Sequence, residues 1–296
     1  MSQQHSHKRP PPSRERPDVI AAQKVLAEMW PGTAGASSVT LLKALHVLTR
    51  DGGLNLDTRR KLKQVLHLVQ LLRPSLDTLL AEGNGESGSG PVIADLGTGK
   101  SYLGFILYDL IVGPAGRGSI AGVDVRAELV ERSQALARAC GFERMSFVAG
   151  DIADTVLPGG RADMVTALHA CDTATDDAIR FALRHQARVV ALIPCCQAEV
   201  ASLLEHARPS PVDQLWRHPL HLREFGAHAT NVLRGLVLEA RGYKVRVTEF
   251  TGLEHTLKNE LILATRHQQS NPLARRKLDQ LVEQLGVRPA LLDVMD

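Results

Sequence analysis

From Val92 onward the chain alternates short apolar runs with longer stretches of helical pattern, and this alternation restricts it to a small set of folds. Five apolar runs of strand length follow one another: VIADLG, SIAGVDV, MSFVAG, ADMVTALHA and RVVALIP. Strands that alternate with helices form a parallel sheet covered on both faces. The sequence therefore predicts a doubly wound α/β domain over residues 92–267.

Two more apolar runs, YKVRVTEF and ELILATR, follow a predicted helix near Glu224 to Arg241. A short loop joins these two runs, as in a hairpin, so the last strand is expected to run antiparallel to its neighbour. The complete sheet is then expected to hold six parallel strands and one antiparallel strand.

The other parts of the chain differ in composition from this domain. Residues 1–17 are basic and proline-rich and predict a disordered tail, and residues 81–91 predict a flexible linker. Residues 18–80 show a helical pattern, with a cap expected at Asn55 or Asp57 and a kink or a new helix after Pro74. Residues 268–296 predict a C-terminal helix.

The composition favours a soluble protein from a reducing compartment. Lys and Arg (35) barely exceed Asp and Glu (32), so the net charge of +3 does not by itself indicate a nucleic-acid binder. The four cysteines form neither a disulfide framework nor a double CxxC zinc pattern. The sequence has no signal-peptide core and no apolar run of membrane-spanning length. We expect a cytoplasmic protein without a membrane partner.

Acidic residues follow three consecutive predicted strands, beside a glycine-containing turn. Gly97 and Gly99 lie just after the first strand, where they allow a tight turn that a ligand can approach closely. Asp124 ends the second strand, where a carboxylate can accept hydrogen bonds from both hydroxyls of a ribose. Asp151 follows the third strand, in a position to receive an adenine amino group. The residues predicted to bind the cofactor are Asp95, Gly97, Gly99, Asp124, Asp151 and Ile152.

Other nucleotide-binding motifs fit these residues less well. A nicotinamide enzyme would have glycine at the position of Tyr102, and a P-loop needs a glycine near the position of Asp95. A further interpretation treats the three aspartates as helix caps or turn residues without a ligand.

Three segments, DLGTGKSYLG, LHACDTATDDAI and IPCC, resemble a methyltransferase-domain family that includes the eukaryotic tRNA ribose 2'-O-methyltransferases. The resemblance covers about residues 92–266, and LNLDTRRKLKQVLHLVQLL looks like a segment of bacterial members. It implies a class I methyltransferase with a seven-stranded Rossmann-like sheet and S-adenosylmethionine (SAM) as methyl donor. The zinc fingers attached to the eukaryotic tRNA enzymes are not evident in the sequence, so their substrate is not carried over.

The methyl acceptor is expected among three loops at the carboxyl edge of the sheet. These are the loop that starts at His169, the Pro194-Cys195-Cys196 turn and the loop that contains Lys258. His169 or Asp172 is predicted to act as the base, and Lys258 to lower the pKa of an acceptor hydroxyl or to hold a phosphate. Asp172 also fits a helix cap. The adjacent cysteines favour a lining role over a zinc site or a nucleophile, so no metal is expected.

The densest basic cluster lies on a predicted helix of the N-terminal region. Arg59, Arg60 and Lys63 lie on or near the polar side of that helix and are predicted to contact RNA phosphates. A solvated helix face explains the same cluster without a ligand. The favoured function is SAM-dependent methylation of tRNA or rRNA. The alternatives are a protein or small-molecule acceptor, or a non-catalytic interaction module.

Overall fold

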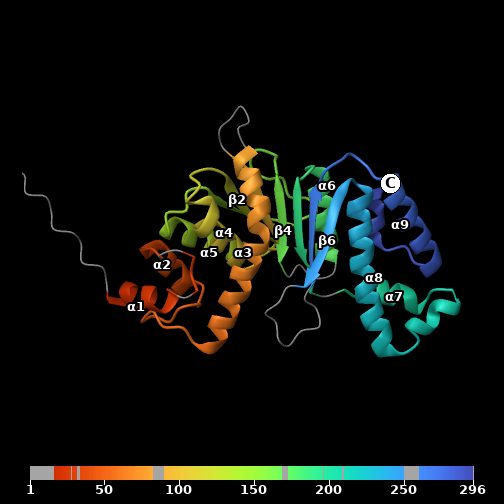
Figure 1. Ribbon diagram of the computed structural model, residues 1–296, viewed down its shortest axis with the longest axis horizontal. Coiled ribbons are helices and arrows are strands. Elements are labelled where there is room, and N and C mark those ends of the chain that lie inside the picture. The colour runs from red at the N-terminus through yellow and green to blue at the C-terminus, as the bar shows by residue number, and fades with distance from the viewer. Residues whose placement is uncertain are drawn as a thin grey trace, which may run out of the picture. The chain divides into compact units, whose positions relative to one another are not determined.

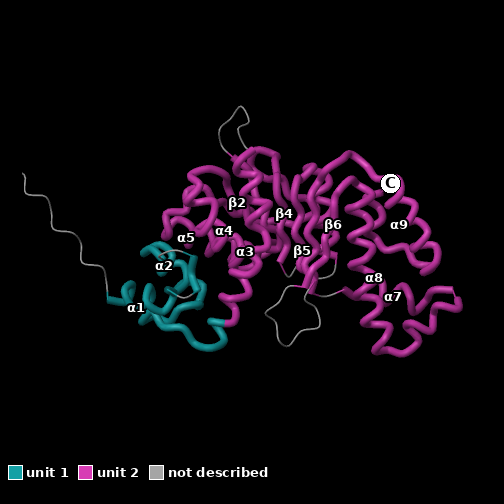
Figure 2. Tube along the Cα trace, viewed as in Figure 1, with its two compact units in different colours: residues 1–59 teal, residues 60–296 magenta. Residues whose placement is uncertain are grey.

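The computed structural model describes residues 17–27, 29–31, 34–82, 90–168, 173–195, 197–208, 210–249 and 260–295. The chain forms two compact units, residues 1–59 and residues 60–296 (Figure 2). The boundary lies inside helix α3 (Leu56–Glu82), whereas the sequence placed the end of the helical region at residue 80. Most of α3 therefore belongs to the same unit as the sheet.

The described part of unit 1 is built around two short helices, α1 (Pro17–Leu26) and α2 (Ala36–Ala44). Lys43 of α2 forms an ion pair with Asp18 of α1 at 2.6 Å. Apolar side chains such as Leu26 of α1 and Leu41 of α2 are fully buried. This unit has a small apolar core of its own.

Helix α3 begins at a cap that the sequence predicted. The Oδ1 atom of Asn55 accepts a hydrogen bond from the backbone N–H of Thr58 at 2.8 Å, which satisfies one of the free donors at the helix start. Pro74 lies inside the same 27-residue helix, so of the two predicted outcomes a new helix is wrong, and a kink stays a prediction. Leu72 and Leu76 are fully buried on either side of Pro74, and this packing offsets the lost backbone hydrogen bond.

The sheet of unit 2 has seven strands in the order β3-β2-β1-β4-β5-β7-β6 (Figure 1). Strand β7 is antiparallel to β5 and to β6, and the other neighbouring pairs are parallel. The predicted sheet is confirmed, with its antiparallel strand between the fifth and the sixth. The strands are β1 (Val92–Leu96), β2 (Ser119–Asp124), β3 (Met145–Ala149), β4 (Met164–Leu168), β5 (Val189–Ile193), β6 (Tyr243–Glu249) and β7 (Glu260–Arg266).

The helices of unit 2 lie where the sequence predicted the connections between strands. Helix α5 packs against β2 and β3, α6 against β4 and β5, and α8 against β6 and β7. No helix of the described part of the chain has the length and apolar character that a membrane span requires. The helical elements are α4 (Tyr102–Leu107), the π-helical turn η1 (Tyr108–Val112), α5 (Ala127–Ala139), α6 (Thr173–Arg184), α7 (Glu199–Glu205), η2 (Pro211–Leu215), α8 (Pro219–Ala240), α9 (Pro272–Leu285) and η3 (Ala290–Met295).

Alternate residues of the strands pack against different helices. Ala94 and Val123 belong to the core that α6 and α8 complete. On the other face, the ring of Phe147 lies 2.6 Å from where a Cβ of Gly122 would stand, so only glycine fits there. The same ring contacts Phe105 of α4, with 5.6 Å between the ring centroids. Both faces of the sheet are therefore covered, as a doubly wound fold requires.

Helix α3 runs antiparallel to the parallel strands. Glu82, at the carboxyl end of α3, forms an ion pair with Arg188, which directly precedes β5. Leu80 lies 3.5 Å from where a Cβ of Gly118 would stand, just before β2. The carboxyl end of α3 thus lies where the strands begin, and Figure 1 shows its first turns on the side where the strands end.

The segment after β5 is more regular than expected. This segment is rich in proline and arginine, which is typical of a loop, yet α7, η2 and the first turns of α8 occupy much of it. The Trp216 side chain is 6% exposed and stacks on Phe225 at 5.0 Å, so it anchors the segment and is not free to stack on a base. Its four histidines (His206, His218, His221 and His228) are exposed.

We expect Leu76→Ala to lower the free energy of unfolding by about 2–5 kcal/mol, because Leu76 of α3 is fully buried and its truncation leaves a cavity. Urea denaturation followed by circular dichroism measures this change. Asp77→Ala is the matched control, since Asp77 is the next residue of the same helix and is exposed. Equal stability of the two variants would contradict the packing of α3 described above.

Candidate active site

The strand order of the sheet reverses between β1 and β4. The strand beside β1 on one side is β2, and the strand beside β4 on the other side is β5. Asp95 of β1 pairs in register with Thr166 of β4. In doubly wound sheets ligands bind in the crevice at this switch point. The predicted glycine turn directly follows β1, so it lies at this edge.

A buried carboxylate holds the glycine turn in place. Asp95 is 2% exposed, and its Oδ2 accepts hydrogen bonds from the hydroxyls of Thr98 at 2.6 Å and Ser101 at 3.3 Å. Its Oδ1 accepts one from the hydroxyl of Thr166 at 2.9 Å. Burial raises the pKa of the Asp95 carboxyl, and these hydrogen bonds oppose the shift. Asp95 thus ties the turn to β4 from inside the protein.

The turn itself has the backbone conformation that its glycines permit. Gly97 and Gly99 have φ angles of 62° and 55°, in the left-handed region that favours glycine. Ser101 adopts φ 52° without being glycine, and it is buried against Asp95. A Cβ on Gly104 would stand 2.6 Å from the Ser101 hydroxyl, so the first turn of α4 needs this glycine. The sequence analysis singled out neither Ser101 nor Gly104.

Asp124 ends β2 at the same edge, beside the turn. Its Oδ2 accepts a hydrogen bond from the backbone N–H of Gly99 at 2.7 Å. The Arg126 side chain covers the carboxylate, with Nε 2.9 Å from Oδ1 and one guanidinium NH2 group 3.1 Å from Oδ2. Burial on its own raises the pKa of this carboxyl, but the hydrogen bonds from Arg126 and Gly99 outweigh it and lower the pKa. Asp124 is therefore an ionised acceptor partnered by an arginine.

The third predicted acidic residue lies on a turn after β3. Asp151 is exposed, and its Oδ1 accepts a hydrogen bond from the backbone N–H of Ala153 at 2.9 Å. Ile152 is 7% exposed and belongs to the apolar core. The Gly150 N–H donates to the backbone oxygen of Asp124 at 3.0 Å, which places this turn directly beside Asp124. Asp151 thus has the contact of a turn residue, and its role at the cofactor stays a prediction.

The three predicted acceptor loops leave the sheet at neighbouring positions. Leu168 and Ile193, the last residues of β4 and β5, are partners in the parallel register. Leu192 pairs with Ile262, so β7 begins beside the point where β5 ends. The roles predicted for His169, Asp172 and Lys258 stay predictions, because these three residues lie outside the described residues. Their flanking residues converge as the topology argument expected.

A comparison with protein families identifies the chemistry of this sheet edge. Residues 60–203 match the family model described as a methyltransferase domain. The chain carries a SAM-dependent methyltransferase domain. The match begins at Arg60, where unit 2 begins, and it spans the glycine turn and all three predicted cofactor-binding carboxylates. No curated protein sequence matches the chain.

Solved structures of several methyltransferases are similar to this chain. Magnesium protoporphyrin IX methyltransferase from Synechocystis is 16% identical, with a TM-score of 0.44, and the match covers 76% of this chain and 94% of that chain. The methyltransferase PaMTH1 of Podospora anserina is 12% identical, with a TM-score of 0.46 and coverage of 89% and 100%. An rRNA methylase from Streptococcus thermophilus is 11% identical, with a TM-score of 0.40 and coverage of 67% and 96%. Likenesses at these scores do not bear on the substrate.

The residues at the ends of β1, β2 and β3 fit SAM as methyl donor. A Cβ added at Gly99 would meet only the Arg126 side chain, 3.6 Å away, so one flexible group covers the turn. Asp124 offers an ionised carboxylate to hydroxyl donors. Val125 is 65% exposed next to Asp124, which provides an apolar surface beside it. A cofactor with a ribose and an apolar ring face suits this combination.

We expect Asp124→Ala to weaken SAM binding by about tenfold or more, because hydrogen bonds between ribose hydroxyls and an ionised acceptor are lost. Isothermal titration calorimetry of the full chain with SAM measures this loss. Glu128→Ala removes an equal charge from the exposed first turn of α5, close to Arg126. It controls for the effect on SAM binding of losing one negative charge near the site. Similar affinities of Asp124→Ala and wild type would show that the ribose binds elsewhere.

Arg126→Ala is expected to have the opposite effect and to tighten SAM binding about two- to fivefold. The Arg126 guanidinium contacts the carboxylate oxygens that a ribose would use, so binding must first break an ion pair in which the arginine is 55% exposed and the aspartate 4% exposed. The same titration detects the gain, and a rise in ionic strength should shrink it. Weaker binding by Arg126→Ala would show that Arg126 instead contacts the cofactor.

Proposed function

We propose that this protein is a cytoplasmic enzyme that transfers the methyl group of SAM to RNA, either tRNA or ribosomal RNA. The observation that carries the proposal is the place of a basic cluster on α3. Arg60 and Lys63 are exposed and belong to the first turns of α3, on the side of the sheet where the parallel strands end (Figure 1). A polyanion bound along these turns lies on the side of Asp124 and the glycine turn.

The other basic segments give weaker support. Arg59 is half-buried at the end of unit 1, so Arg60 and Lys63 supply the more accessible charges. A second basic cluster lies on α9 and consists of Arg275, Arg276 and Lys277. Arg275 forms an ion pair with Asp279 at 2.9 Å, which neutralises part of this cluster. The basic tail lies largely outside the described residues. The start of α3 is therefore the surface that we propose for RNA phosphates.

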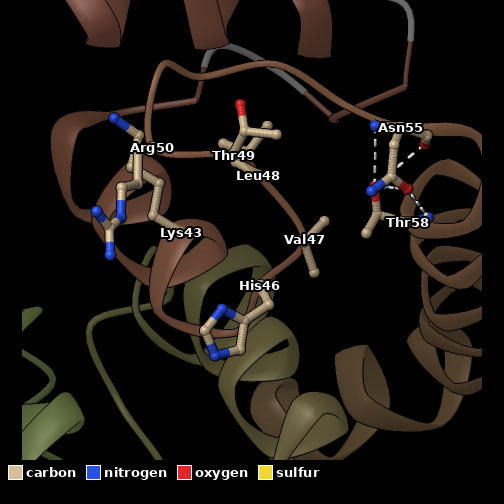
Figure 3. A pocket seen from close by; sticks show the side chains of 8 residues that line it. All are labelled: Lys43, His46, Val47, Leu48, Thr49, Arg50, Asn55 and Thr58. Atoms are coloured by element: carbon tan, nitrogen blue, oxygen red, sulfur yellow. Dashed lines mark hydrogen bonds between the residues drawn. The ribbon is translucent and has the colours of Figure 1, made fainter.

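Unit 1 provides a second basic surface. An open pocket of about 470 Å³ is lined by Lys43, His46 and Arg50 on one segment and by Asn55 and Thr58 at the start of α3 (Figure 3). His46 and Arg50 are exposed, whereas the charge of Lys43 is partly neutralised by its pairing with an aspartate. The lining also includes Val47 and Leu48, and its cationic side chains favour an anionic ligand, of which RNA phosphates are one.

The chemistry needs alignment of the acceptor and removal of its proton. When bound, SAM supplies an electrophilic methyl group on a positively charged sulfur. The loops after β4 and β5 and before β7 flank the switch point, so an acceptor held among them lies beside the cofactor turn. We propose His169 or Asp172 as the base for an oxygen or nitrogen acceptor and Lys258 as its electrostatic partner.

The double variant Arg60→Glu, Lys63→Glu should bind RNA more weakly, with a salt dependence reduced by about 1–2 in the slope of log K against log salt. Fluorescence titration of labelled tRNA and rRNA fragments at several salt concentrations measures this slope. The matched control is Arg276→Glu, Lys277→Glu, which changes the charge equally at two exposed positions of α9.

Equal salt slopes for the two double variants would exclude the start of α3 as the RNA surface. The substrate class itself is tested with labelled SAM and total RNA from a strain that lacks the protein. Transfer of label to RNA supports the proposal. Transfer to the protein or small-molecule fraction and not to RNA would overturn it.

A further inference from the structure

One buried amide beside the switch point has an oxygen without a hydrogen-bond donor. Gln197 directly follows the Pro194-Cys195-Cys196 turn after β5, and the residue is 6% exposed. Its Nε2 donates a hydrogen bond to Oδ1 of Asn231 at 3.2 Å. Its Oε1 is fully buried, and among the described residues no group donates to it.

Charged groups fix which end of each amide faces which neighbour. Arg234, which is fully buried, donates from Nη1 to Oδ1 of Asn231 at 3.2 Å. Asn231 in turn donates from Nδ2 to the carboxylate of Glu260 at 2.7 Å. A guanidinium can only donate and a carboxylate can only accept, so the Asn231 amide cannot be reversed. Gln197 must then present its Nε2 to Asn231, and Oε1 is left as the unused acceptor.

The network is held from behind by a buried ion pair. Nε of Arg234 donates to Oδ1 of Asp176 at 2.7 Å, and both side chains are almost fully buried. Burial raises the pKa of the Asp176 carboxyl, and the Arg234 guanidinium opposes this shift. The pair fixes the position of Arg234, and through Arg234 and Asn231 it fixes Gln197. The geometry of this site is thus set before any ligand binds.

The network lies where the three predicted acceptor loops meet the rest of the protein. Gln197 follows the loop after β5, and Glu260 is the first residue of β7. Asp176 lies in the first turn of α6, directly after the loop from β4. All three loops are thus flanked by one hydrogen-bonded network. Buried polar groups are nearly always satisfied in native proteins, so Oε1 of Gln197 is expected to have a partner, either an ordered water or a group of a ligand.

We propose that Oε1 of Gln197 accepts a hydrogen bond from an N–H or O–H group of the methyl acceptor, so that Gln197 is a substrate-binding residue. The inference rests on the proposed function in that the acceptor is taken to be RNA. In RNA the donor is then a base amino or imino group or a ribose 2'-hydroxyl. A donor on the acceptor completes the network, whereas an acceptor atom at the same place is repelled. Gln197 thereby favours a nucleotide that places a hydrogen-bond donor next to Oε1.

The test compares Gln197→Met with wild type in methyl transfer from labelled SAM to RNA isolated from a strain that lacks the protein. Met keeps nearly the same volume and removes the unused oxygen. We expect kcat/KM for RNA to fall about tenfold or more. The dissociation constant for SAM and the melting temperature should stay close to those of wild type. Gln197→Asn, which keeps the amide but draws it back by one methylene, serves if the Met variant does not fold.

Thr230→Val is the matched control. It removes a buried hydroxyl of α8 that donates to the Gly226 carbonyl at 2.7 Å, next to Asn231 but outside the network. We expect a lower melting temperature and an unchanged kcat/KM. An unchanged kcat/KM for folded Gln197→Met as well would overturn the inference, since an internal water then suffices to satisfy Oε1.

The experiment distinguishes failure of the Gln197 inference from failure of the proposal that the acceptor is RNA. If wild type labels a protein or small-molecule fraction and leaves RNA unlabelled, the RNA proposal fails. The Gln197 comparison is then made on the labelled fraction, where a tenfold fall still supports a hydrogen-bond donor on the acceptor. Failure of wild type to label any fraction of the extract would overturn both.

Discussion

The buried carboxylate of Asp95 is the constraint on which the rest of the site depends. Taking a carboxylate out of water costs several kcal/mol unless donors replace its hydration. Here three hydroxyls do so, two from the turn after β1 and one from β4. The pKa of Asp95 is still raised, so the donors reduce the cost of burial without removing it. The fold supports this cost because the carboxylate joins the cofactor turn to the strand that leads into the acceptor loop.

Asp124, one strand away, shows how position on the same edge changes the role of an aspartate. Arg126 and the Gly99 N–H lower the pKa of its carboxyl. The Asp124 side chain is 4% exposed, whereas the Arg126 side chain that pairs with it is 55% exposed. A ribose therefore competes with an internal partner and not with water alone. Asp95 builds the turn from within, whereas Asp124 presents a charged acceptor at its rim.

Local sequence patterns were sufficient to predict the sheet and the position of the cofactor turn. The apolar runs correspond to the seven strands, and the Asn55 cap forms as expected, because both depend on neighbours close in sequence. At Pro74 the pattern left a kink and a new helix open, because the effect of this proline depends on packing that the local pattern does not contain. The stacking of Trp216 on Phe225 likewise depends on tertiary contacts. Tertiary contacts override local propensity at both positions.

The residues that the sequence did not identify act through contacts that no local pattern specifies. Arg126 looks like an ordinary surface cation two residues after Asp124, and its pairing depends on the bend between β2 and α5. Gln197 and Asn231 are 34 positions apart, and no spacing rule relates them. The predicted roles of His169, Asp172 and Lys258 stay predictions, although their strands converge as expected.

The two halves of the sheet edge differ in how fully their polar groups are satisfied. On the side of β1 and β2, described donors pair with every oxygen of Asp95 and Asp124, so a cofactor there exchanges existing partners for new ones. On the side of β5 and β7, an ion pair and two amides are arranged around an acceptor that stays unused. A buried ion pair adds little net stability compared with apolar packing, and its better-attested use is to fix one arrangement. Arg234 and Asp176 serve this purpose here together with Glu260, because Arg234 donates to Oδ1 of Asn231 and Glu260 accepts from its Nδ2, and both contacts hold the Asn231 amide in one orientation.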